Sequence, residues 1–512
     1  MWRRLGAAVA SGLLVTAAFP PLDFGLLSLV AFIPLLWAWR DATPKRAALY
    51  GLAWGVAFFS VLVSWAWYFG AVAIAPLVVV LASYAAISGL LVGLFAKRGI
   101  RSPWLTAAVW VTLEALRTRW PVGGFAWGEA GVSLHSVAFG RALASWGGVP
   151  LVSFLILAWN GLLLDALTGA RVRRRAFAAA GTALIVVVVV AGDVARFEPT
   201  PTGTLRFALL QGNNLDRVLT PEEIAAQYLT NQHFRLADTL RGHYDLIVFP
   251  ESGLDTDPEH DPALRARIVA LAKKHDSYVL VNALTPAGGV RVFNTNLLYD
   301  PDGKLQGTYS KQHLVPYGEY VPFRQQLSFI QELQQIPHDF KAGTKRRVFE
   351  VNRHKIGTVV CFESAFGPLV RGFVRDGAQA IVVTTNNRSY RRSANSAQHL
   401  ALSQMRAAET ARPVLHDSIS GSTAVIDSSG VVHQRTRLFH NAVVAGRITT
   451  ERGETPYVRY GDWVEWACAL AVLAAALVAC TRRRPGSESP AADVRTVESA
   501  PLPTHIPVRE RL

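Results

Sequence analysis

The sequence predicts a polytopic α-helical membrane domain joined to a layered α/β domain that lies outside the cytoplasm. Three observations support this fold class. Apolar residues make up 51% of the 512-residue chain and charged residues only 17%, and the apolar residues concentrate in residues 1–195 and 463–480. The basic residues between the apolar runs fall mostly on one side of the expected membrane. Residues 203–450 read as an ordinary globular domain in which strand-like and helix-like segments alternate.

Several apolar runs are long enough to cross the roughly 30 Å of hydrocarbon in a bilayer. Arg3 and Arg4 precede the first run, which could therefore be a signal peptide, but the spans that follow at once favour a first membrane helix. We expect a bundle of about seven helices over residues 1–197 and a final transmembrane helix at 463–481. The candidate spans lie near residues 6–22, 25–39, 47–68, 73–96, 103–116, 143–167, 176–193 and 463–480.

The orientation of these spans follows from the distribution of Lys and Arg. If the N-terminus is cytoplasmic, the inside segments hold 15 basic residues and the short outside loops hold 3. This bias requires an odd number of spans before residue 203, so both termini are expected in the cytoplasm and the α/β domain outside it. Much of the formal charge of +15 is therefore explained by basic residues on the cytoplasmic side of the membrane, and it is poor evidence for nucleic-acid binding. The basic, Pro/Ser/Glu-rich residues 482–512 are expected to form a disordered cytoplasmic tail.

Within residues 203–450 we expect a layered α/β sandwich. Thr220, Pro221 and Glu223 form a capping-box signature at the start of one helix, and the PDG sequence at 301–303 suits a hairpin. Near-continuous apolar runs indicate strands that are buried on both faces. The expected strands are 205–213, 245–251, 278–284, 293–300, 304–310, 356–361, 378–387, 422–432 and 441–449, and the expected helices are 221–241, 263–275, 362–375 and 395–410.

Glu251 ends the buried strand in VFPES, where partial desolvation would raise the pKa of the carboxyl toward that of a general base. A surface glutamate beside a helix cap is the simpler interpretation. Lys311 lies in YSKQHLVPYGEYVPF (309–323), a shaped loop rich in Pro, Gly and aromatic residues, where it could hold a fixed positive charge near an oxyanion. It could equally be a solvated loop lysine. Glu319, eight residues on, could hold the lysine or the base in place, or be a plain turn residue.

Cys361 stands between an apolar strand and an expected helix, and Cys468 and Cys480 lie far away in the last apolar segment. A leftover cysteine outside the cytoplasm is either an inert buried side chain or a reactive thiol. A helix N-terminus would supply backbone N–H groups and partial positive charge, which lower the pKa of a thiol and can receive an oxyanion. Glu363 could orient a substrate amine or cap the helix.

The segments VFPES, YSKQHLVPYGEYVP and VVCFES resemble, in this order, three signature regions of the nitrilase/carbon–nitrogen hydrolase superfamily, over roughly residues 203–450. That resemblance implies a nitrilase-like αββα sandwich with Glu251, Lys311 and Cys361 as a catalytic triad. With the membrane spans added, and with HLVPYGEYVPF at 313–323, the chain resembles the apolipoprotein N-acyltransferase family over about residues 1–481.

The family resemblance implies a reaction in a bacterial cytoplasmic membrane. Cys361 would attack an acyl ester of a membrane phospholipid and form a thioester, in a ping-pong scheme. Glu251 would activate the thiol and then the α-amine of a diacylglyceryl-cysteine on a lipoprotein, and Lys311 would stabilise the tetrahedral intermediates. The residues implied to support the site or bind substrate are Glu319, Glu363, Phe362, Tyr317 and Asn386.

The segment TTNNRSYRRSANS (384–396) departs from the family pattern. Asn386 and Asn387 fit and Tyr390 can replace the family's aromatic residue, but the usual glycine is absent. Phe362 stands where the family often has Tyr, and a Trp is missing after QGN at 211–213. These differences bear on lipid preference and activity. Three arginines in the segment could bind anionic headgroups or be solvated: Arg388, Arg391 and Arg392.

Two other functions fit the sequence: a membrane-tethered amidase with the same fold, and a non-catalytic paralogue that binds lipoproteins or lipids. The thirteen histidines lack metal-ligand spacing, and His399 has Ser403 rather than a ligand at i+4. We therefore expect no metal and no cofactor. The expected partners are a phospholipid donor, a diacylated lipoprotein acceptor and the bilayer itself.

Overall fold

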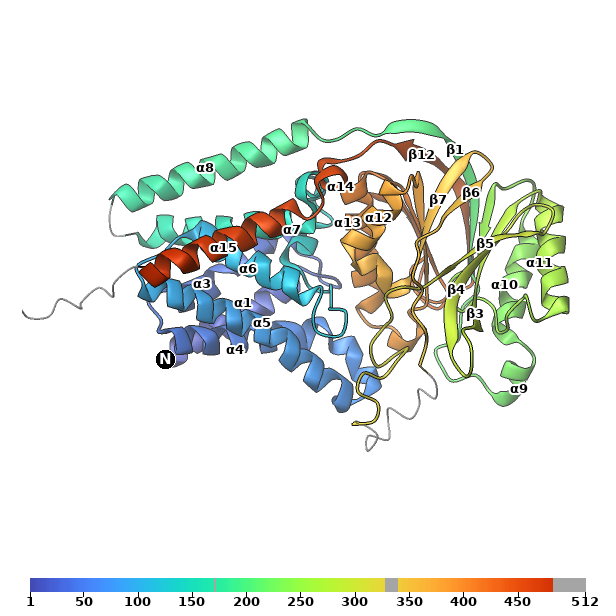
Figure 1. The fold of residues 1–512 in the computed structure, drawn as a ribbon, viewed down its shortest axis with the longest axis horizontal. Helices are drawn as coiled ribbons and strands as arrows, with labels where there is room; N and C mark the ends of the chain where they lie inside the picture. The colour runs from blue at the N-terminus through green and yellow to red at the C-terminus, as the bar shows by residue number, and fades with distance from the viewer. Residues whose placement is uncertain (170–171, 327–338, 482–512) are drawn as a thin grey trace, which may run out of the picture.

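The computed structural model describes residues 1–169, 172–326 and 339–481, and it places a helical bundle beside a domain built from two β-sheets (Figure 1). The predicted tail at 482–512 lies outside the described residues. The bundle contains α1 (Trp2–Ala17), η1 (Gly25–Leu27), α2 (Ser28–Ala31), α3 (Ile33–Trp39), α4 (Pro44–Leu62), η2 (Ser64–Phe69), α5 (Ala71–Lys97), α6 (Pro103–Arg117), η3 (Ala130–Leu134), α7 (Ala138–Thr168), α8 (Val172–Val194) and α15 (Trp463–Thr481).

Helical segments occupy all eight predicted span positions, but they differ in length. Among the described residues, four helices are long and apolar enough to cross a membrane: α5, α7, α8 and α15. The segment 25–39 is divided into three short helices, and Pro34 lies in the first turn of the last of them. The described helices therefore agree with a membrane domain, although several are shorter than a full span.

Helix α7 is broken by Gly147 and Gly148, and Gly148 has φ +71°, which disfavours other residues. The break leaves backbone N–H groups without a helical acceptor. Glu409, which belongs to the α/β domain, accepts a hydrogen bond from the Val149 N–H at 2.7 Å. The α/β domain thus caps part of a bundle helix, and this contact fixes one domain against the other.

The described residues of the α/β domain form two six-stranded sheets, with the orders β12-β1-β2-β3-β4-β5 and β11-β10-β9-β8-β7-β6. Helices α10 (Tyr228–Thr239) and α11 (Pro262–His275) lie on the side away from the bundle, and α12 (Gly367–Arg375) and α13 (Asn395–Thr410) face the bundle (Figure 1). The strands are β1 (Thr200–Gln211), β2 (Leu246–Val248), β3 (Tyr278–Pro286), β4 (Val292–Tyr299), β5 (Leu305–Ser310), β6 (Val348–Val351), β7 (His354–Val360), β8 (Ala380–Thr385), β9 (Val414–Ser418), β10 (Ala424–Ile426), β11 (Val432–Arg435) and β12 (Ala442–Arg452).

The core between the sheets is apolar: Phe207 and Leu280 from one sheet and Val359 and Val382 from the other are at most 1% exposed. Such packing explains the near-continuous apolar strands, since both faces are covered. The helix–sheet–sheet–helix layers confirm the predicted αββα sandwich. The hairpin predicted at 301–303 also joins β4 to β5, with the Gly303 N–H donating to the Asp300 carbonyl.

Several predicted elements were wrong in detail. The single helix expected over 221–241 is two helices, α9 (Pro221–Ala225) and α10, because Gln227 adopts φ +49° between them. The single strand expected over 422–432 is a hairpin whose turn is closed by the Asp427 N–H donating to the Val431 carbonyl at 3.0 Å. The sequence also missed strands β6 and β9. Cys361 is followed by the short 3-10 turn η5 (Cys361–Ala365), and α12 begins at Gly367.

Candidate active site

The three residues singled out from the sequence lie just beyond the ends of three strands. Glu251 follows β2, Lys311 follows β5 and Cys361 follows β7. The first two come from one sheet and the third from the other, and the sheets pack face to face. The fold therefore brings together side chains that are up to 110 positions apart in the chain.

Lys311 is 1% exposed and lies between two carboxylates. Its Nζ is 3.0 Å from Glu319 Oε1 and 3.6 Å from Glu251 Oε1. The Asn294 amide donates to the same two oxygens, at 3.1 Å and 2.7 Å respectively. Burial alone would lower the pKa of the Lys311 ammonium, but Glu319 and then Glu251 outweigh it and raise that pKa. Lys311 is therefore a fixed positive charge.

Glu251 links both sheets. Its second oxygen, Oε2, accepts a hydrogen bond from the Asn386 backbone N–H at 2.8 Å, just after β8. Burial raises the pKa of the Glu251 carboxyl, while Lys311, Asn294 and a hydrogen bond from the Cys361 thiol act in the opposite direction. The carboxylate therefore has a raised affinity for a proton, as a general base requires.

Cys361 has φ +53°, a conformation that costs energy in a residue other than glycine and is often found at functional sites. Its carbonyl oxygen lies 3.0 Å from His399 Nε2. Because a carbonyl can only accept, Nε2 carries the proton, and burial lowers the pKa of His399 to about 4, so the ring is neutral. His399 therefore helps to hold the strained backbone at Cys361.

The lowered thiol pKa expected for Cys361 was wrong. Burial, and then the negative charge of Glu251, raise the pKa of the thiol to about 12, although Lys311 acts in the opposite direction. The reason is local: a 3-10 turn follows Cys361 in place of a long helix, and the sulfur lies in a desolvated position. The resting side chain is a neutral thiol that needs a base.

Glu363 is fully buried, and its carboxylate is occupied by protein donors. It accepts from the backbone N–H groups of Val360 (2.8 Å), Gln312 (2.7 Å) and His313 (3.1 Å), and from the Tyr309 hydroxyl (2.8 Å). These contacts join the loop that carries Lys311 to the turn that carries Cys361. The structure therefore favours a holding role for Glu363 over contact with a substrate amine.

The other predicted residues lie at different places around the site. Phe362 is buried, and its ring stacks near Trp127 and Phe125 of the bundle, with centroid distances of 6.4 and 5.9 Å. Asn386 contributes its backbone N–H to Glu251, and its side chain accepts from the Arg388 N–H. Tyr317 is 42% exposed, so the structure does not bring its ring into the buried cluster.

Sequence reasoning missed a ladder of asparagines that supports the cluster. Asn282 on β3 donates to Asn294 Oδ1 and Asn296 Oδ1 on β4, at 2.8 and 2.9 Å. Asn296 then donates to the Thr358 hydroxyl on β7 at 2.6 Å, which joins the two sheets. The alternating asparagines of FNTN (293–296) were the available signal, because side chains two apart on a strand share a face.

The three arginines of the unusual 384–396 segment contact neighbouring loops and the bundle. Arg388 donates to the carbonyl of Leu215 at 3.2 Å and to that of Arg217. Arg391 lies over the Tyr68 ring at 5.5 Å, and Arg392 pairs with Asp216 at 3.6 Å. These contacts give the arginines a structural role, which the sequence did not suggest. Tyr390 also packs against the bundle, with its ring 4.9 Å from that of Trp65.

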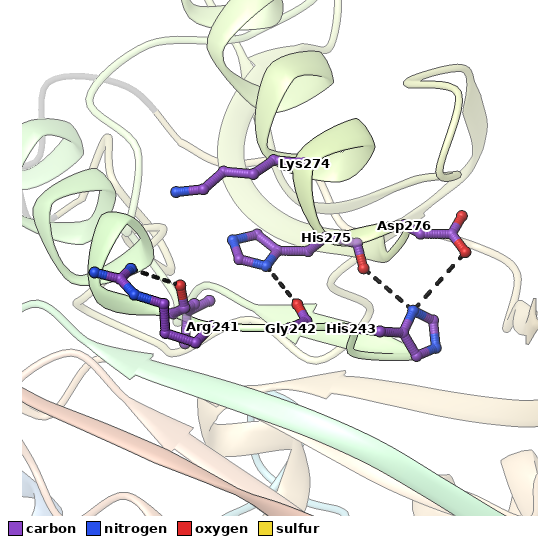
Figure 2. A pocket seen from close by; sticks show the side chains of 7 residues that line it. Arg241, Gly242, His243, Lys274, His275 and Asp276 are labelled. Atoms are coloured by element: carbon purple, nitrogen blue, oxygen red, sulfur yellow. Dashed lines mark hydrogen bonds and ion pairs between the residues drawn. The ribbon is translucent and has the colours of Figure 1, made fainter.

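A surface hollow at the C-terminal ends of α10 and α11 is separate from this cluster (Figure 2). Its side chains mostly hold one another: His275 Nδ1 donates to the Gly242 carbonyl at 2.7 Å, and His243 Nδ1 lies 3.2 Å from the His275 carbonyl (Figure 2). None of its lining residues belongs to the Lys311 cluster. Within the described residues, no group of three or more His, Cys, Asp or Glu side chains could hold a metal ion.

Comparison with known proteins agrees with both halves of the chain. The family model described as the apolipoprotein N-acyltransferase N-terminal domain matches residues 11–162, and that of carbon–nitrogen hydrolase matches residues 208–455. The apolipoprotein N-acyltransferase of Geobacter metallireducens is 31% identical over 93% of this chain and 95% of its own length. The chain belongs to the apolipoprotein N-acyltransferase family.

A second curated relative agrees with this assignment. The apolipoprotein N-acyltransferase of Methylococcus capsulatus is 33% identical over 89% of this chain and 92% of its own length. Among solved structures, a carbon–nitrogen hydrolase superfamily protein from Xanthomonas campestris matches with a TM-score of 0.38 and 21% identity, covering 53% of this chain and 97% of that one. Membership of the family makes this chain a bacterial membrane protein with N-acyltransferase character.

Proposed function

We propose that this protein transfers an acyl chain from a membrane phospholipid to the α-amino group of the N-terminal diacylglyceryl-cysteine of lipoproteins. The observation that carries the proposal is the buried cluster in which Lys311 lies between Glu251 and Glu319, together with the Cys361 thiol, whose pKa responds to the charges of Glu251 and Lys311. A base, a nucleophile and a fixed cation are thus within reach of one reacting carbonyl.

The first half-reaction would acylate the protein. Glu251 takes the proton of the Cys361 thiol as the sulfur attacks the ester carbonyl of the lipid, and Lys311 stabilises the resulting oxyanion. Collapse of this intermediate breaks the ester bond, and the lysophospholipid alkoxide leaves with the proton from Glu251. The products are a thioester on Cys361 and a lysophospholipid.

The second half-reaction would consume the thioester. Glu251 accepts a proton from the α-amine of the acceptor as the nitrogen attacks the thioester carbonyl, and Lys311 again stabilises the oxyanion. Breaking the C–S bond gives an amide, and the sulfur recovers its proton from Glu251. An acyltransferase must keep water from the thioester, and a base and a cation that are each less than a tenth exposed beside a membrane bundle favour a lipid-borne amine over water.

Under this proposal the catalytic domain lies on the outer side of the cytoplasmic membrane and both termini lie in the cytoplasm, as the basic residues of the loops predict. Glu319 and Asn294 hold Lys311 and Glu251 in place, and Glu363 holds the two loops together.

The decisive experiment supplies the purified protein in lipid nanodiscs with acyl-labelled phospholipid and then a diacylated lipopeptide. We expect hydroxylamine-sensitive label on the protein, and mass spectrometry should show a third acyl chain on the lipopeptide. Cys361→Ala should abolish both signals while the protein remains folded. Label that persists on the Cys361→Ala protein would refute the thioester assignment, and release of ammonia from small amides without acyl transfer would indicate an amidase.

A further inference from the structure

Helix α13 lies between the bundle and the second sheet, and two adjacent residues on it face different partners. Gln398 is 4% exposed and points to the bundle, while His399 is 1% exposed and holds the Cys361 carbonyl at 3.0 Å. Successive helix positions project about 100° apart, so one short stretch of α13 can contact both domains.

Gln398 uses its full hydrogen-bonding capacity on the bundle. Its Oε1 accepts from the indole N–H of Trp127 at 2.7 Å and of Trp65 at 3.0 Å. Its Nε2 donates to the backbone carbonyls of Pro20 and Leu62, both at 3.1 Å. The orientation of the amide is fixed chemically, because an indole N–H can only donate and a carbonyl can only accept.

The four partners come from four separate segments of the bundle: the loop after α1, the last residue of α4, η2, and the loop after α6. Two of them also pack against aromatic side chains of the α/β domain. The Trp127 ring stacks near that of Phe362, the residue after Cys361, and the Trp65 ring packs against Tyr390. Gln398 thus joins the bundle segments that contact the turn after Cys361 and the 384–396 segment.

We infer that Gln398 is a positioning residue that fixes the location of Cys361 relative to the membrane bundle, so that an acyl donor anchored in the bilayer reaches the thiol in a productive orientation. The inference rests on the proposed phospholipid donor. Small misplacements of reacting groups lower the rate by large factors. The need for accurate positioning is greatest when the acyl donor is held separately, here by the bilayer.

The geometry separates this role from that of His399. The hydrogen bonds of the His399 ring stay inside the α/β domain, with Ser364 Oγ at 2.7 Å and Asn387 Nδ2 at 3.2 Å, and its one ring contact with the described bundle residues is with Trp127, at 5.8 Å. Loss of the Gln398 amide therefore leaves the turn around Cys361 supported. A small water-soluble ester, which needs no alignment with the bilayer, should still acylate the thiol.

The test compares two acyl donors on the full-length protein in nanodiscs: acyl-labelled phospholipid in the bilayer and p-nitrophenyl butyrate in the water. We expect Gln398→Met to lower the rate of acylation by phospholipid about tenfold or more, because four buried polar groups lose their partner. The rate with the ester should stay within about twofold of wild type.

Gln404→Met is the matched control. Gln404 is a buried glutamine on the same helix that also contacts a bundle residue, with Oε1 2.9 Å from His135 Nδ1, but it is not next to the residue that holds Cys361. Both donors should react with this variant within about twofold of wild type.

Trp65→Phe provides a milder variant if Gln398→Met fails to fold. It removes one of the two indole donors, and it should lower the phospholipid rate selectively, so an unchanged phospholipid rate in folded Trp65→Phe would overturn the inference. An unchanged phospholipid rate in Gln398→Met, or an equal loss with both donors, would overturn the inference. A wild-type protein that reacts with the ester but never with phospholipid would instead overturn the proposed function.

Discussion

Lys311→Met isolates the charge at the centre of the buried cluster. The lysine is 1% exposed, and its Nζ lies 3.0 Å from Glu319 and 3.6 Å from Glu251. Methionine fills most of the same apolar volume and removes the ammonium. Two buried carboxylates that share the Asn294 donor then lose their common cation, and they repel each other.

Breaking a buried ion pair by removing one partner costs about 3–5 kcal/mol of folding free energy, because the remaining charge is uncompensated. Adding Glu319→Gln to Lys311→Met removes one of the two stranded charges. The double variant should therefore be more stable than Lys311→Met alone, and a cycle that includes Glu319→Gln alone should give a coupling free energy of about 0.5–3 kcal/mol between the two substitutions. Thermal unfolding in the same detergent and at the same pH measures this difference.

The acylation rate should not recover with folding stability when Glu319→Gln is added to Lys311→Met. Loss of an oxyanion-stabilising group lowers the rate by about 10²–10³-fold, and Glu319→Gln does not replace the lost cation. Acyl-enzyme formation from labelled phospholipid should therefore stay low in the double variant even as its stability recovers. The reasoning fails if Lys311→Met is as stable as wild type, or if the double variant recovers acylation together with stability.

Two further predictions concern the base and the loop contacts. The pH profile of kcat/KM for acylation should have an acid limb above the ordinary glutamate pKa of 4.5, because burial raises the pKa of Glu251. Activity is lost as the pH falls because the base gains a proton. An acid limb at or below 4.5 would exclude Glu251 as that base. Glu363→Gln should lower the free energy of unfolding by about 1–3 kcal/mol and slow acylation, because an amide N–H would then face backbone N–H donors. Thermal unfolding at neutral pH that matches wild type would contradict the expected loss of stability.

The main architecture could be predicted from the sequence because the two domains differ in their local residue patterns. Apolar runs indicated the helices of the bundle, and the strand–helix alternation indicated the layered domain. The residues of the cluster were found because Glu251, Lys311 and Cys361 each stand in a short recognisable segment at a strand end. In each of these segments, the same few residues indicate both the strand end and the candidate functional side chain.

Other features depended on contacts that no local pattern contains. Strand β9 was missed because VLHDS looks polar, yet His416 and Asp417 are fully buried. No local pattern marks Gln398, because its partners lie more than 270 residues away in the chain. The predicted thiol pKa was wrong because helix-terminus reasoning did not include the desolvation of Cys361 or the charge of Glu251 beside it.

The raised pKa of Cys361 has a consequence for a thiol outside the cytoplasm. Under the proposed topology the site faces an oxidising compartment, where a persistent thiolate is the species most easily oxidised. A thiol with a pKa of about 12 stays neutral at rest, and the adjacent Glu251 can take its proton only as the sulfur attacks a carbonyl. Burial therefore does two things at once: it protects the nucleophile between turnovers, and it ties the formation of the reactive sulfur to the arrival of a substrate whose developing negative charge Lys311 can stabilise.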